Sequence, residues 1–223
     1  MCRLYKTGIK EIIMSKVFFK PWIGKNYLTH GYNGKKIFLL GESHYCGDCL
    51  APCPDYFSEK CKNKTIQVVE DFLNYKNNNG VHKPYMTTYT RFTNIFIGKK
   101  IRNNELINFW NSVVFYSYIQ IAMDKPRQEP SMEDFETGDE AFVEVIQELQ
   151  PDVIIVWGNR LWEKMPDSFH EINEDFLDRQ GRLLYYYFNN GKEIPAMGIY
   201  HPSSSYFTYE DSPFFKVLLE KTL

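Results

Sequence analysis

Two titratable residues each follow an apolar run, and the two runs lie far apart in the chain. Glu42 follows residues 37–41, and His201 follows residues 194–200. A buried strand that stops at such a residue delivers it to the rim of a sheet, and open α/β sheets bind ligands at the carboxyl ends of their strands. A carboxylate and an imidazole in one cleft can position water and donate a hydrogen bond. We therefore predict one catalytic site that contains Glu42 and His201.

A second group of residues that could do chemistry is a cluster of four cysteines, Cys46, Cys49, Cys53 and Cys61. A Cys-x2-Cys pair fits one edge of a tetrahedral metal site, and the other two thiolates could complete it. The cluster predicts a bound zinc ion or iron–sulfur cluster. The spacing matches no strict signature, so a loop with reduced thiols or an incidental disulfide is the alternative.

The elements that must position these residues alternate between strand-like and helix-like segments. Apolar, β-branched and aromatic runs predict strands, and apolar residues at helical spacing predict helices. The order fits an α/β fold, a three-layer α/β/α sandwich with a mainly parallel central sheet, in one domain over residues 1–223. The predicted strands are 37–41, 113–118, 153–158, 183–188 at a sheet edge, and 194–200. The predicted helices are 65–75, 86–97, 139–149 and 211–219.

The composition narrows the class of protein. The 223 residues carry a net charge of −2, so charge alone predicts no tight non-specific binding to nucleic acid. Aromatic residues make up 17% of the chain, which favours a packed body over disorder. No apolar run approaches the ~20 residues of a membrane span, and no secretory signal is apparent. We expect a soluble, cytoplasmic protein with reduced thiols.

Three short motifs carry a resemblance to a known family. They are Gly41-Glu42-Ser43-His44-Tyr45 after an apolar strand, Trp157-Gly158-Asn159 after another, and the late His201-Pro202-Ser203. In this order they resemble the landmarks of the uracil-DNA glycosylase superfamily, over roughly residues 37–207. The resemblance implies a hydrolase of base excision repair that binds DNA. It would cleave the N-glycosidic bond of uracil or another deaminated base.

The resemblance also implies roles for individual residues. Base release builds positive charge on the sugar and negative charge on the base, so a site needs a carboxylate near C1′ and a donor near the leaving base. Glu42 matches a water-positioning Glu of some branches, and His201 matches the group that stabilises the departing base. In the best-known branch the activating Asp stands one residue later, where this chain has Ser43.

Further residues are assigned to substrate binding by the same resemblance. Tyr45 matches a Tyr that excludes the methyl group of thymine, and Ser117 stands where the family commonly has an Asn that reads the base edge. An aromatic of the following loop, Tyr56 or Phe57, would stack on the flipped base. After His201, the serines would contact phosphates, and Tyr206 or Phe207 would fill the gap left by the flipped nucleotide. The full predicted binding set is Gly41, Ser43, His44, Tyr45, Phe57, Ser117, Ser203, Ser205 and Tyr206.

Two other functions fit parts of the sequence. Gly41-Glu42-Ser43-His44 partly matches the nucleophile elbow of serine hydrolases, with Ser43 as nucleophile and His201 as base, although Tyr45 replaces the second Gly. A catalytically inactive relative that binds nucleic acid or a nucleotide is the other alternative. Its phosphate contacts could include the basic residues Lys99, Lys100 and Arg102.

Overall fold

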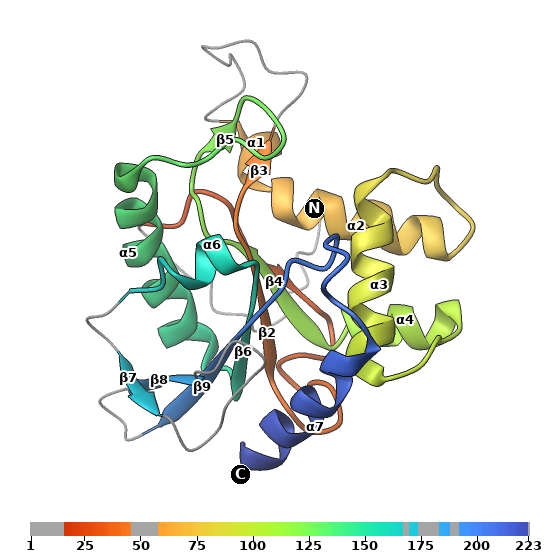
Figure 1. Ribbon diagram of the computed structural model, residues 1–223. Coiled ribbons are helices and arrows are strands. Elements are labelled where there is room, and N and C mark those ends of the chain that lie inside the picture. The colour runs from red at the N-terminus through yellow and green to blue at the C-terminus, as the bar shows by residue number, and fades with distance from the viewer. Residues whose placement is uncertain (1–15, 46–57, 167–169, 174–182, 188–191, 223) are drawn as a thin grey trace, which may run out of the picture.

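A central sheet of seven strands organises the computed structural model, which describes residues 16–45, 58–166, 170–173, 183–187 and 192–222. The order across the sheet is β1-β4-β2-β6-β9-β8-β7 (Figure 1). β4, β2, β6 and β9 run parallel, while β1, β8 and β7 are antiparallel to their neighbours. The strands are β1 (Trp22–Ile23), β2 (Ile37–Gly41), β4 (Val113–Ser117), β6 (Val153–Trp157), β7 (His170–Asn173), β8 (Leu183–Tyr187) and β9 (Glu193–Ile199). The prediction of an α/β fold with a mostly parallel sheet is confirmed.

The parallel strands are apolar throughout because helices cover both of their faces. Every residue of β2, β4 and β6 is buried. Alternate residues point to opposite sides, so Leu39 joins one core cluster and Leu40 the other. In the register of the sheet, Leu40 lies between Tyr116 and Val156.

The helices divide between the two faces of the sheet (Figure 1). One face is covered by α2 (Lys64–Lys76), α3 (Tyr85–Ile97), α4 (Asn103–Trp110) and α7 (Ser212–Lys221). The other is covered by α5 (Met132–Leu149) and α6 (Asn159–Trp162). The remaining described elements are α1 (Glu59–Lys62), the 3₁₀ helix η2 (Tyr209–Asp211), and the two-stranded sheet of β3 (His44–Tyr45) and β5 (Ala122–Met123).

Two predictions about these elements are wrong. Helix α5 begins at Met132, not at Asp139, because Ser131 and Asp134 form a capping box that starts the helix seven residues earlier. Strand β8 is not at the edge, because β7, which the sequence did not indicate, pairs with its outer side.

The order of the parallel strands creates a topological switch point. Along the chain they come as β2, β4, β6 and β9, but β2 lies between β4 and β6. The chain therefore goes from β2 to β4 on one side of β2 and then crosses to β6 on its other side. Ligands of such sheets bind at the carboxyl ends beside this point. In Figure 1 these ends point upward, toward β3, β5 and α6.

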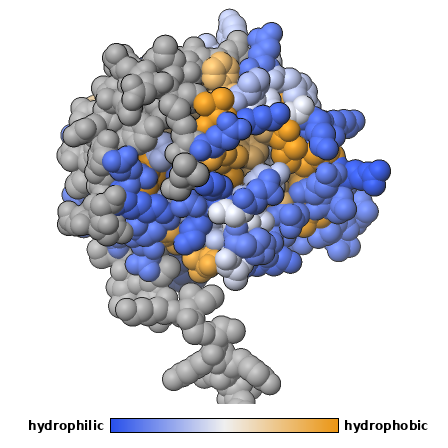
Figure 2. Space-filling view, turned by 90° about the horizontal axis from the view of Figure 1, so that it is seen from below, coloured by the Kyte–Doolittle hydropathy of each residue, from blue (hydrophilic) through white to orange (hydrophobic). Residues whose placement is uncertain are grey.

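The side of the molecule away from these strand ends has a mainly hydrophilic surface (Figure 2). Figure 2 shows it from below, with hydrophilic residues over most of the described surface and hydrophobic residues in small patches between them. Within the described residues, no helix is long and apolar enough to cross a membrane. The assignment of residues 1–223 to one domain stays a prediction.

Candidate functional site

A cavity of about 380 Å³ opens at the carboxyl ends of the four parallel strands, on the side covered by α2 and α3. We call it the strand-end cavity. Its volume is within the range of small-molecule sites. Each parallel strand contributes a residue at or just after its end, and α2 and α3 supply the opposite wall. The lining residues are Gly41, Glu42, Ser43, His44, Tyr45, Lys64, Gln67, Val68, Asp71, Lys83, Tyr85, Thr88, Tyr89, Phe115, Ser117, Trp157 and His201.

The sequence prediction that Glu42 and His201 share one cavity is confirmed by this lining. Gly41 makes room for the Phe115 ring of β4, since a Cβ there would lie 3.1 Å from that ring. Glu42 directly follows this point of close approach. Six of the nine predicted substrate-binding residues also line the cavity or bond directly to one that does: Gly41, Ser43, His44, Tyr45, Ser117 and Ser203.

Glu42 is held by an arginine that the sequence analysis did not single out. Nε of Arg160 donates to one carboxylate oxygen at 2.7 Å, and an Nη donates to the other. Arg160 lies in α6, which follows β6, so this ion pair bridges the switch point between β2 and β6. The bond to Glu42 raises the pKa of Arg160. A carboxylate has about four lone-pair sites, so two bonds to Arg160 fix its orientation and leave room for a water molecule.

The turn that carries Arg160 depends on a glycine. Gly158 has φ of 102°, a conformation that residues with a Cβ rarely adopt. Its N–H donates to the carbonyl of Ile199 at 2.8 Å, which ties the end of β6 to the end of β9. The motif Trp157-Gly158-Asn159 therefore positions Arg160 and fixes the segment that leads to His201.

His201 is bonded in a way that defines its tautomer. The backbone N–H of Ser203 donates to Nδ1 at 3.2 Å, and the Ser203 hydroxyl lies 2.7 Å from the same nitrogen. Burial lowers the pKa of His201, although the negative charge of Glu42 acts in the opposite direction. The neutral ring with Nδ1 as acceptor carries its proton on Nε2. His201 can therefore donate a hydrogen bond from Nε2.

A second histidine forms the inner part of the cavity. His44 is only 9% exposed, and its Nε2 lies 2.8 Å from the Thr65 hydroxyl and 2.9 Å from the Ser117 hydroxyl. Burial lowers its pKa to about 3, and the positive charge of Lys64 acts in the same direction. Ser117, which was predicted to read a base edge, thus forms a hydrogen bond with the neutral His44 ring at the end of β4.

Aromatic side chains form one wall of the cavity, and they are not the ones predicted for stacking. Tyr89, Phe115 and Trp157 line it, with ring centroids 5.2 Å apart for Phe115 and Trp157. Tyr56 and Phe57 lie outside the described residues. The spacing of Tyr89 in its helix and of Phe115 in its strand indicated core positions. The sequence therefore did not indicate that these two side chains also line a cavity.

The other residues predicted to bind the substrate divide into exposed and buried ones. Tyr45 is 50% exposed and Tyr206 is 70% exposed, so both side chains are accessible. Phe207 is fully buried against Phe92, so the prediction that it could fill a gap in DNA is wrong. Ser205 is exposed on the segment after His201 but does not line the cavity.

The serine-hydrolase arrangement has no support in the hydrogen bonds of the described residues. Ser43 lines the cavity, but the His201 ring bonds to Ser203 and the His44 ring to Ser117 and Thr65. A nucleophile and its base must lie within hydrogen-bond reach. Lys99, Lys100 and Arg102 line neither this cavity nor the larger one described below.

The predicted metal site falls mostly outside the part of the chain that the structure describes. Cys46, Cys49 and Cys53 lie there, while Cys61 is a part-buried residue of α1. The described residues contain no group of three or more His, Cys, Asp or Glu that could hold a metal ion. The cysteine cluster therefore stays a prediction.

The strand-end cavity holds groups that could position water, donate a hydrogen bond and stack on a flat ligand. It joins an oriented carboxylate, a neutral imidazole donor and a wall of flat rings at the switch point of the sheet. Neither a scan against protein-family models nor a search of curated proteins finds a match for this chain.

Proposed function

We propose that this protein is a glycosylase-like hydrolase that cleaves the N-glycosidic bond of uracil or another deaminated base in DNA. The observation that carries the proposal is that Glu42 and His201 follow two parallel strands and line one cavity. The proposal includes membership in the uracil-DNA glycosylase superfamily, a three-layer α/β/α sandwich, and a cytoplasmic role in base excision repair.

The proposed reaction assigns a separate task to each side of the cavity. Glu42, oriented by Arg160, accepts a hydrogen bond from water and directs it at C1′ of the sugar. The C1′–N bond breaks, and its electron pair leaves with the base. His201 donates from Nε2 to an oxygen of the base, where negative charge develops. Water supplies the hydroxyl left on C1′ and the proton taken up by the base.

Substrate selection would rest on the inner wall. A base removed from the stack is held by aromatic contacts and hydrogen bonds to its edge. Tyr89, Phe115 and Trp157 offer such contacts, and the Ser117 hydroxyl offers a short polar group. Tyr45 lies at the exposed side, in keeping with exclusion of the thymine methyl group.

A catalytically inactive binding module is the second candidate. The observation that favours it is the Arg160 pair, because a neighbouring positive charge offsets the charge with which Glu42 would stabilise a cationic sugar. This candidate predicts that DNA or a nucleotide binds the cavity without release of the base.

The test is base release from labelled oligonucleotides that contain uracil, hypoxanthine or xanthine, in single- and double-stranded form. Glu42→Gln and His201→Ala are measured in parallel, with His30→Ala as control because His30 is exposed and lines neither cavity. Abasic sites made by the wild type and the control, but not by the two cavity variants, would support the proposal. A folded wild-type protein that binds these strands but releases no base would favour the binding module.

A further inference from the structure

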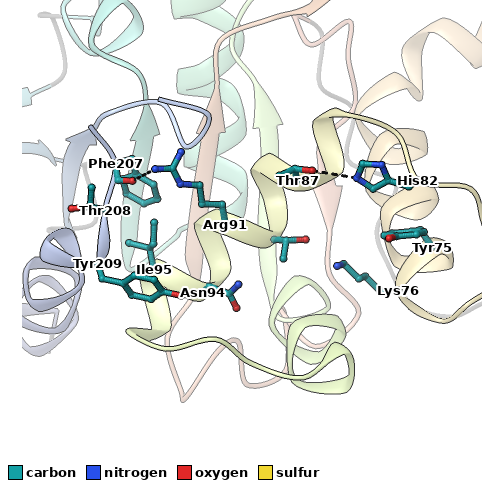
Figure 3. Close-up of a pocket in the computed structure, with 11 residues that line it drawn as sticks. Tyr75, Lys76, His82, Thr87, Arg91, Asn94, Ile95, Phe207, Thr208 and Tyr209 are labelled. Carbon is teal, nitrogen blue, oxygen red and sulfur yellow. Dashed lines mark hydrogen bonds between the residues drawn. The ribbon is translucent and has the colours of Figure 1, made fainter. Parts of the chain in front are cut away.

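A second and larger cavity, of about 620 Å³, lies over the outer side of α3 (Figure 3). Its floor includes Thr87, Thr90, Arg91 and Asn94, which share one face of the helix because they stand at i, i+3, i+4 and i+7. The end of α2 bounds it on one side, and residues 207–209 bound it on the other. We call it the α3 groove.

The charged side chains that line the α3 groove are cationic. They are Lys76 and Arg91, and none of the lining residues is an Asp or Glu. Within the described residues, neither Lys76 nor Arg91 forms an ion pair with a carboxylate. Nearby Lys83, by contrast, pairs with Asp71. The groove therefore suits an anionic ligand.

Contacts within the groove hold these groups in place. Arg91 donates to the carbonyl of Phe207, which uses one of its five N–H groups. The Lys76 ammonium lies 5.3 Å from the centre of the Tyr75 ring. Nε2 of His82 lies 3.2 Å from the Thr87 hydroxyl. Arg91 thus keeps further donors in a fixed plane, a geometry that matches the oxygens of a phosphate group.

Aromatic rings add a second kind of contact. Tyr75 and Tyr209 lie on opposite sides of the α3 groove (Figure 3), and Tyr209 is 50% exposed. Exposed Tyr206 lies on the same segment. Single-stranded nucleic acid combines phosphates with flat bases and is bound by cationic grooves with aromatic platforms. An acidic peptide would use the charges of this groove but not its rings.

The groove and the strand-end cavity are neighbours along the chain. Lys83 and Thr88 line the strand-end cavity, whereas His82 and Thr87 line the α3 groove. Residues after β9 serve both, since His201 lines the first and Phe207–Tyr209 line the second. We infer that the α3 groove binds a single-stranded segment of DNA that continues from the nucleotide in the strand-end cavity. This inference rests on the proposed function for its choice of DNA as ligand.

Equilibrium binding of a fluorescein-labelled, single-stranded oligonucleotide without damaged bases tests the inference. Thr87→Glu puts a negative charge on the exposed floor of the groove. Thr137→Glu makes the same change on an exposed turn of α5, across the sheet. We expect Thr87→Glu to weaken binding roughly tenfold at low salt and Thr137→Glu to change it less than about twofold.

A second pair of variants removes charge instead of adding it. Lys76→Gln acts in the groove, and Lys25→Gln acts at an exposed lysine that lines neither cavity. If Lys76 contacts one phosphate, its loss lowers the slope of log affinity against log salt by about 0.7, and Lys25→Gln leaves it unchanged. Circular dichroism verifies that all four variants are folded.

Three outcomes would overturn the inference: no strand binding by the wild type at low salt, equal losses in the groove and control variants, or displacement of the strand by polyglutamate at equal charge. Because this oligonucleotide has no base to release, binding and catalysis are read separately. Groove-dependent binding without base release from damaged strands would refute the proposed reaction but support the groove. If the groove variants changed neither base release nor strand binding, the proposed reaction would be supported and the groove inference refuted.

Discussion

His44 and His201 line the same cavity, yet their surroundings differ. His44 is buried, lies between two hydroxyls, and has its pKa lowered to about 3. His201 is exposed and bonds to neighbouring Ser203, and the negative charge of Glu42 acts to raise its pKa. A buried neutral histidine with both hydroxyl partners contributes to structure, whereas a histidine at a rim with a free donor can serve chemistry. The cavity thus has a buried inner wall and an exposed outer rim, and the rim is where we propose that the chemistry takes place.

The largest expected effect separates these two histidines by activity. His201→Ala should lower base release at least ~10²-fold, because in the proposed reaction it removes the donor to the departing base. Its free energy of unfolding should stay within about 0.5 kcal/mol of the wild type, since the ring bonds only to Ser203 among the described residues. Single-turnover base release and urea unfolding measure the two quantities. A large loss of stability would show that His201 is structural as well.

The reverse pattern is expected for the inner histidine. His44→Ala should lower the free energy of unfolding by about 3 kcal/mol, because it opens a cavity and removes the partner of the Ser117 and Thr65 hydroxyls. Its activity per folded molecule should fall less than that of His201→Ala. Urea unfolding with activity assays below the transition tests both points. If His44→Ala were as stable as the wild type, the distinction between a structural inner histidine and an exposed outer one would fail.

The pH dependence of stability should also identify His44. Its pKa of about 3 in the folded protein lies below the unfolded value of 6.5, so the unfolded chain binds the proton more tightly. The stability it contributes is present above pH 6.5 and is lost as pH falls toward 3. Between pH 7 and pH 5 the loss should be about 2 kcal/mol. Urea unfolding of the wild type and of His44→Gln at both pH values isolates the contribution of His44 to this loss. Equal losses of stability in the two proteins would contradict the prediction.

The smallest effect concerns how the rim is oriented. Arg160→Lys keeps the positive charge but cannot hold both oxygens of Glu42 in one plane. We expect base release to fall about tenfold in kcat with little change in KM, because in the proposed reaction the carboxylate would lose its orientation but keep its contact with the substrate. The kcat of Arg160→Gln should be lower still, because this variant also loses the positive charge. An Arg160→Lys enzyme with wild-type kcat would remove Arg160 from the proposed mechanism.

The strands and helices were largely predictable because the parallel strands are continuous apolar runs, whereas the helices have apolar residues at helical spacing. The apolar runs of β2, β4, β6 and β9 end within one or two residues of the predicted ends. Local signals were weaker where a cap, rather than an apolar pattern, starts a helix, as Ser131 does for α5. Strand β7 was missed since its pairing with β8 is a long-range feature.

The sequence by itself determined that Glu42 and His201 stand at strand ends, because hydrophobic runs and the residues that stop them are local properties. Only the tertiary structure decided which residues meet there. Arg160 lies 118 residues from Glu42 and Thr65 lies 21 residues from His44, and neither pairing has a local signature. The same is true of the α3 groove, whose two sides come from α2 and the segment after β9. Side-chain pairs of this kind depend on strand order and helix packing, which the whole fold sets.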